Sequence, residues 1–109
     1  MEIDREFLKG SISLLLLNLL SRGELYGYEI LQEASRRSGN TFEFKEGTLY
    51  PALHQLEKKG QIKSEWRTAE NGRERKYYSL TPKGRKAAAE YEKRWQHLTG
   101  AIAAVLESK

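Results

Sequence analysis

The stretch of residues 46–81 reads EGTLYPALHQLEKKGQIKSEWRTAENGRERKYYSLT and contains two patterns that together indicate the class of fold. Its first half predicts a helix, because Leu49, Leu53 and Leu56 recur three and four residues apart and form one apolar stripe. Its second half predicts a β-hairpin, since two short runs of alternating side chains flank an Asn-Gly turn at residues 71–72. A helix followed directly by a hairpin indicates the second half of a winged helix-turn-helix.

The chain before this stretch supplies the two further helices that such a fold needs. Residues 5–21 predict a deeply packed helix, because their apolar side chains occur at i, i+4, i+7 and i+8 spacing. Residues 23–40 predict a second helix, which carries Tyr26 on its apolar face and ends after Arg36 and Arg37. Three short helices and a two-stranded hairpin make an α+β, mainly α, winged helix-turn-helix.

The helix predicted from residues 46–60 has an unusual outer face. Away from its leucines lie Thr48, Tyr50, Pro51, His54, Gln55 and Lys58. We expect this helix to begin close to Gly47, because proline is best tolerated near the first turn, where its missing N–H costs least. Tyr50 has two interpretations, a contact with a base or phosphate and a core position beneath the hairpin. The lone His54 is interpreted as a groove-contacting or solvated side chain.

The C-terminal segment predicts a helix that is too long for one small domain to cover. Thr81 and Pro82 are a predicted N-cap and first-turn proline, and the helix is expected to continue to about Ser108, a span of about 38 Å. Its apolar residues form a heptad seam, which needs a partner helix. The seam comprises Ala88, Tyr91, Trp95, Leu98, Ile102 and Val105, and all but Ala88 are predicted dimer contacts. We therefore expect a DNA-binding domain at residues 1–81 and a dimerisation helix at residues 82–109.

Charge is distributed unevenly along the chain. Residues 1–57 hold six basic and nine acidic residues, a net charge of −3, whereas residues 58–109 hold thirteen basic and six acidic residues, a net charge of +7. The basic half indicates a polyanionic partner. Its cations gather near the end of the third helix and in the hairpin, where phosphates are expected, although a solvated hairpin tip is the alternative. They are Lys58, Lys59, Lys63, Arg67, Arg73, Arg75 and Lys76.

Composition argues against several other classes of protein. The 109 residues include no Cys and two His, so disulfides, thiol redox sensors and Cys-ligated metals are excluded, and we expect no metal site and no cofactor. We find no nucleophile–base pair and no Gly-rich phosphate loop, so we do not expect an enzyme. The apolar run from Ile12 to Leu20 is too short to span a bilayer, and the acidic N-terminal residues differ from a signal peptide. We therefore expect a cytoplasmic protein with no membrane contact.

Four runs of residues resemble the PadR family of bacterial transcriptional regulators. They are YGYEI (26–30), EGTLYPALHQLEKKGQI (46–62), SEW (64–66) and GRERKYYSLTPKG (72–84). The resemblance covers about residues 8–95, and the combination of the GTLYPALHQLEKKG and GRERKYYSLT runs is specific. The single long C-terminal helix is similar to the compact subgroup of this family.

This resemblance implies a homodimeric repressor that binds an inverted repeat in double-stranded DNA and releases it on a small-molecule or stress signal. The residues that it places at the DNA are Lys45, Thr48, Tyr50, Pro51, His54 and Gln55 around the recognition helix, and Arg73, Arg75 and Lys76 in the wing. Some members bind planar apolar compounds between their subunits. Here Leu14, Asn18, Ala88, Tyr91, Trp95 and Thr99 are expected to line that space.

Two questions stay open at the level of sequence. Trp95 is interpreted either as a core residue of the dimer seam or as part of a flat aromatic slot for a planar ligand. The long helix is alternatively expected to pair with a different protein, which would make the chain a winged-helix interaction module. Self-association discriminates between these functions, because a chain with a heterologous partner is a monomer in isolation.

Overall fold

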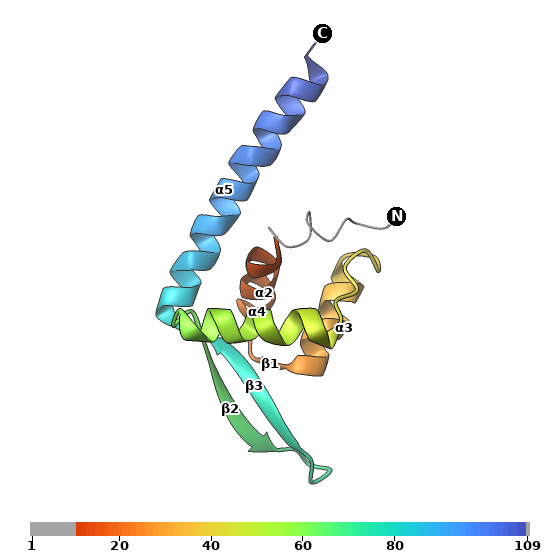
Figure 1. The fold of residues 1–109 in the computed structure, drawn as a ribbon, viewed down its shortest axis with the longest axis vertical. Coiled ribbons are helices and arrows are strands. Elements are labelled where there is room, and N and C mark those ends of the chain that lie inside the picture. Colours follow the sequence, from red (N-terminus) through yellow and green to blue (C-terminus); the bar gives the residue numbers. More distant parts are fainter. Residues whose placement is uncertain (1–10, 109) are drawn as a thin grey trace.

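The computed structural model of the protein describes residues 11–108. The elements of this part of the chain are, in order, α2 (Ile12–Leu20), β1 (Leu25–Tyr26), α3 (Gly27–Arg37), α4 (Glu46–Lys58), β2 (Ile62–Thr68), β3 (Glu74–Leu80) and α5 (Pro82–Glu107). Helices α2, α3 and α4 gather above the β2–β3 hairpin, and α5 leaves this body as a single long arm (Figure 1). The predicted α+β, mainly α, winged helix-turn-helix is therefore confirmed. Of the helix predicted from residues 5–21, residues 5–10 lie outside the described residues, and Ser11 is the N-cap of α2.

The second helix begins later than predicted, and the sheet has a third strand. Leu25 and Tyr26 form β1, which pairs antiparallel with β3 so that the sheet order is β1-β3-β2. The prediction of a helix from residue 23 was therefore wrong, whereas the predicted hairpin is confirmed as β2 and β3, to which β1 adds a third strand that was not predicted. Extended backbone at Tyr26 is favoured by this pairing, and the Tyr26 N–H also donates to Glu29 Oε1 at 3.1 Å, which helps to close the first turn of α3.

Helix α4 begins at Glu46, one residue before the predicted start near Gly47, and Pro51 lies in its second turn. A proline at this position cannot donate to the carbonyl of Gly47, four residues earlier. Both residues are exposed, and water can therefore satisfy the free Gly47 carbonyl. This solvent access explains why the helix continues through Pro51.

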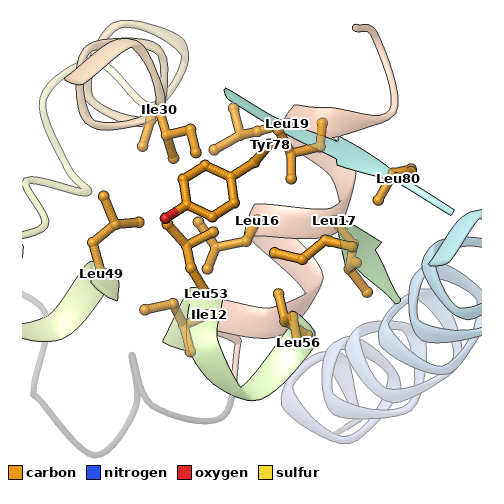
Figure 2. Packing of buried hydrophobic residues seen from close by; sticks show 13 residues of the cluster. Ile12, Leu16, Leu17, Leu19, Ile30, Leu49, Leu53, Leu56, Tyr78 and Leu80 are labelled. Atoms are coloured by element: carbon orange, nitrogen blue, oxygen red, sulfur yellow. The ribbon is translucent and has the colours of Figure 1, made fainter. Parts of the chain in front are cut away.

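The hydrophobic core lies where α2, α3 and α4 meet the inner side of the sheet (Figure 2). Its fully buried side chains are Leu16, Leu17, Leu20, Ile30, Leu49, Leu53, Leu56 and Ile62. The predicted leucine stripe of α4 is thus confirmed, and each such leucine stabilises the fold by about 1.5–3 kcal/mol when fully buried. Because this stripe faces inward, the polar side of α4 faces solvent.

The wing, defined as β2, β3 and the loop between them, is buried only at its base. Its register runs from Ile62 opposite Leu80 to Thr68 opposite Glu74. Ile62 and Leu80 belong to the core, whereas Trp66, nearer the tip, is 64% exposed. At the tip Gly72 has a φ of +82°, the left-handed conformation that the Asn-Gly pair predicts.

Helix α5 is the long helix that the sequence predicts, and within residues 11–108 it packs on the core along its first half. Ala87, Ala88 and Tyr91 pack against the core of the same chain, while the helix from Glu92 to Glu107 is exposed. No helix within residues 11–108 combines the length and the hydropathy needed to cross a membrane.

Candidate nucleic-acid interface

Helix α4 turns a continuous row of polar side chains to solvent. Helical geometry places Tyr50 and His54 on neighbouring turns of one side, and Thr48 and Gln55 two turns apart. Lys45, the N-cap residue, extends this row beyond the helix. All six residues predicted around the recognition helix are exposed, namely Lys45, Thr48, Tyr50, Pro51, His54 and Gln55.

An open hollow of about 840 Å³ lies between α3, α4 and the wing. We call it the wing hollow, and its lining residues are Tyr26, Gly27, Tyr28, Tyr50, Trp66, Arg73, Glu74, Arg75, Lys76 and Tyr78. The structure thus brings Tyr50 of α4 together with the three cations predicted in the wing. The other predicted residues of α4 lie outside this hollow, along the helix surface.

Two cations of the wing hollow lie against aromatic rings. The Arg75 guanidinium carbon is 4.4 Å from the centroid of the Tyr26 ring. Lys76 Nζ is 5.7 Å from the centroid of Tyr78 and 6.0 Å from that of Trp66. These contacts restrict the side chains without neutralising their charge. An anion that binds here therefore meets cations that have already lost part of their conformational freedom.

Arg67, another cation of the hairpin, does not line the wing hollow and is paired with carboxylates. Its guanidinium pairs with Glu24, with Nη2 at 2.8 Å from Oε2, and also donates to Glu65 Oε2 at 3.2 Å. The hydrogen bond from Arg67 lowers the pKa of the Glu24 carboxyl, and its acidic partners raise the pKa of Arg67, so both charges persist at neutral pH. The pair connects the segment before β1 to β2, which restrains the wing relative to the helices.

Tyr50 lies directly over the start of α3. A Cβ at Gly27 would meet the Tyr50 hydroxyl and lie 3.1 Å from Cζ of that ring, so a larger residue at this position would push the end of the Tyr50 side chain away. Tyr50 is 44% exposed, while Tyr78 is only 5% exposed and occupies the core position beneath the wing. Burial raises the pKa of Tyr78, with smaller contributions from Tyr50 and Glu57. The structure therefore places Tyr50 at the surface rather than in the core.

Sequence reasoning did not assign two exposed aromatic residues of this hollow. Tyr28 follows Gly27 in α3, and Trp66 lies on the strand β2. The sequence did not show that these two residues lie near the wing cations. Trp66 falls on the same side of the alternating strand as the buried Ile62, which does not indicate an exposed position. The sequence feature that could have identified Trp66 is its position in a hairpin beside several cationic residues.

The predicted effector site is brought together only in part. Leu14, Tyr91 and Trp95 line a surface hollow of about 280 Å³ between α2 and α5, together with Ser13, Arg94 and Leu98. Asn18, Ala88 and Thr99 do not line it. Ala88 packs on the core, and the Thr99 hydroxyl donates to the Trp95 carbonyl at 2.9 Å. Within residues 11–108, no three His, Asp or Glu side chains are grouped so that they could hold a metal ion.

The seam of α5 divides into two parts in the single chain. Tyr91 is half-buried beside α2, whereas Trp95, Leu98, Ile102 and Val105 are exposed. Apolar side chains of this size are rarely left in a row facing water, and such patches mark interaction surfaces. The exposed part of the seam is therefore available to a partner.

Comparisons with known proteins agree on one family. The sequence profile of the transcriptional regulator PadR-like family matches residues 16–90. A transcriptional regulator of Mycobacterium tuberculosis is 40% identical over 86 residues, which are 79% of this chain and 77% of that protein. A solved transcriptional regulator of Clostridium thermocellum is 33% identical, with a TM-score of 0.83 over 91% of this chain and 96% of that one. A solved PadR-like transcriptional regulator of Bacillus cereus is 30% identical, with a TM-score of 0.83 over 95% of this chain and 99% of that one. The protein with this chain therefore belongs to the PadR-like family of transcriptional regulators.

Proposed function

We propose that this regulator is a homodimeric repressor, which binds an inverted-repeat operator in double-stranded DNA and releases it on a small-molecule or stress signal. The observation that carries DNA binding is the wing hollow, where Tyr50 meets Arg73, Arg75 and Lys76. Helix α4 enters the major groove, and the wing cations contact the adjacent phosphates. This function needs no catalysis and places the protein in the cytoplasm.

Base edges are contacted by the exposed row of α4 that includes Thr48, His54 and Gln55, while Lys45 and Pro51 lie against the backbone at the edge of the groove. Amide and hydroxyl groups of this kind form hydrogen bonds with bases, and ammonium and guanidinium groups pair with phosphates. Affinity for DNA should therefore fall steeply as the salt concentration rises.

The dimer forms through the exposed seam of α5. Residues 1–81 act as the DNA-binding domain and residues 82–109 as the dimerisation helix. A twofold-symmetric pair presents two α4 helices to successive major grooves, about 34 Å apart along one face of DNA. The exposure of Trp95, Leu98 and Ile102 supports this arrangement, because pairing removes them from water.

A planar apolar effector would bind where α2 and α5 of one chain face the second copy. The hollow lined by Leu14, Tyr91 and Trp95 supplies one wall of that site. A ligand that binds one tilt of α5 better than another shifts the dimer toward that tilt, and so changes the separation of the recognition helices.

Fluorescence-anisotropy titration tests this function directly. The labelled duplexes are the DNA upstream of the protein's own gene and a scrambled duplex of equal length, each at several salt concentrations. We expect tight binding to the first and weak binding to the second, with Tyr50→Ala about tenfold weaker and still dimeric. Gln32→Ala, a change at an exposed residue of α3 that does not line the wing hollow, is the control. Equal weak binding to both duplexes by a monomeric protein would instead support the interaction-module alternative.

A further inference from the structure

Besides the packing of Ala87, Ala88 and Tyr91 on the core, three hydrogen bonds at its first turn join helix α5 to the DNA-binding domain. Thr81 Oγ1 donates to the Gly60 carbonyl at 2.6 Å, and the Thr81 N–H donates to the Gln61 carbonyl at 3.1 Å. The Gly84 N–H in turn donates to Thr81 Oγ1 at 3.0 Å. We call these four residues the α5 joint. It links the loop that ends the recognition helix α4 directly to the first turn of α5.

Gly84 is required in this joint for space and not for backbone conformation. It is buried inside a regular helix and is not among the glycines with positive φ. A Cβ at Gly84 would overlap the carbonyl oxygen of Gln61 and lie 2.8 Å from its carbonyl carbon. These are backbone atoms, so no side-chain rotation relieves the collision. Alanine is otherwise the better helix former, so the glycine at this position is explained by the close approach of the α5 backbone to the Gln61 carbonyl.

The length of α5 amplifies any change at this joint. Its 26 residues span about 39 Å, and its second half has no support within the described part of the chain. A tilt of about 5° at the joint therefore moves the far end of α5 by about 3.4 Å, which is the rise of one base pair. In a dimer held through α5, the same tilt moves one DNA-binding domain relative to the other.

We infer that Gly84 sets the separation of the two recognition helices and thereby selects the number of base pairs between the operator half-sites. Gly84 is then a specificity-determining residue that acts through geometry and touches no DNA. This inference rests on the proposed homodimer bound to an inverted repeat. It assigns half-site choice to α4 and spacer choice to the α5 joint, so the two properties should be separable by mutation.

Selection from a pool of random-sequence duplexes separates these properties. The variants are Gly84→Ala, Thr81→Val and the control Gly100→Ala. Gly100 lies in the same helix, and a Cβ there meets no atom within 4 Å, so the identical substitution leaves the joint intact. Thr81→Val keeps the shape of the side chain but removes the hydroxyl that bonds Gly60 and Gly84. Circular dichroism and sedimentation establish that each variant is folded and dimeric.

Wild type and Gly100→Ala should enrich one half-site at one spacer length. Gly84→Ala should enrich the same half-site with a spacer changed by at least about one base pair, and Thr81→Val should enrich a mixture of spacers. A folded, dimeric Gly84→Ala variant that retains the wild-type spacer overturns the inference. If Gly84→Ala does not fold, a single unchanged spacer with Thr81→Val overturns it. A wild-type protein that enriches no repeated half-site contradicts the proposed function itself, so the two failures are distinguishable.

Discussion

Replacing Leu98 with alanine tests whether the exposed seam of α5 is the dimer interface. Leu98 is 50% exposed in the single chain, so about half of its side chain is available to a partner. Burying a whole leucine stabilises by about 1.5–3 kcal/mol, and the exposed half therefore contributes about 0.8–1.5 kcal/mol. A twofold-symmetric dimer loses this contribution twice. The Kd of the dimer should accordingly rise about 10- to 150-fold.

Sedimentation equilibrium over a range of protein concentrations measures this Kd. Gln96→Ala is the matched control, because Gln96 is similar in size to Leu98 and lies about 200° around the helix from it. Leucine and alanine are both good helix formers, so α5 itself should persist in the variant, as circular dichroism can verify. The reasoning is refuted if both variants weaken the dimer equally, or if the wild type is a monomer throughout.

Three further predictions concern the core and the wing hollow. Leu53→Ala should lower the free energy of unfolding by about 2–5 kcal/mol in urea denaturation, since Leu53 is buried in the core, and a loss below about 1 kcal/mol would contradict that position. Gly27→Ala should weaken DNA binding about as much as Tyr50→Ala, because the new Cβ forces the end of the half-exposed Tyr50 side chain to move, while the free energy of unfolding should change by less than about 1 kcal/mol; unchanged DNA binding would disprove the contact. Burial raises the pKa of Tyr78 above its usual value near 10, so its stabilising contribution is complete below that pH and is lost as the pH rises further. Tyr78→Phe should therefore flatten the fall in stability above about pH 10 in urea denaturation, and parallel curves for the two proteins would argue against it.

Local patterns allowed most of the fold to be predicted. The spacing of Leu49, Leu53 and Leu56 repeats with the period of a helix, and these residues form the inward stripe of α4. Gly72 adopts the left-handed conformation that a hairpin tip requires, and Thr81 caps α5 as its hydroxyl chemistry predicts. Each feature depends on residues within a few positions of one another, so a single sequence contains enough information to predict it.

Structural features that depend on contacts between residues distant in the sequence were not predicted, or were predicted incorrectly, from the sequence. Leu25 and Tyr26 form a strand because β3 lies beside them, although their sequence continues into α3. No local pattern in the sequence distinguishes Gly84, because its contact with Gln61 arises only when α5 meets the loop after α4.

The candidate site shows the same division between local pattern and tertiary contact. Composition and periodicity along the chain were enough to predict a basic hairpin after a helix with a polar outer face. The contacts of the individual cations follow from the fold: Arg67 pairs with Glu24, 43 residues away, while Arg75 and Lys76 lie against aromatic rings in the hollow that Tyr50 also lines. The physical reason is that helix and strand periodicity follow from backbone geometry, whereas the pairing of two charges depends on the distance between residues that folding alone brings together.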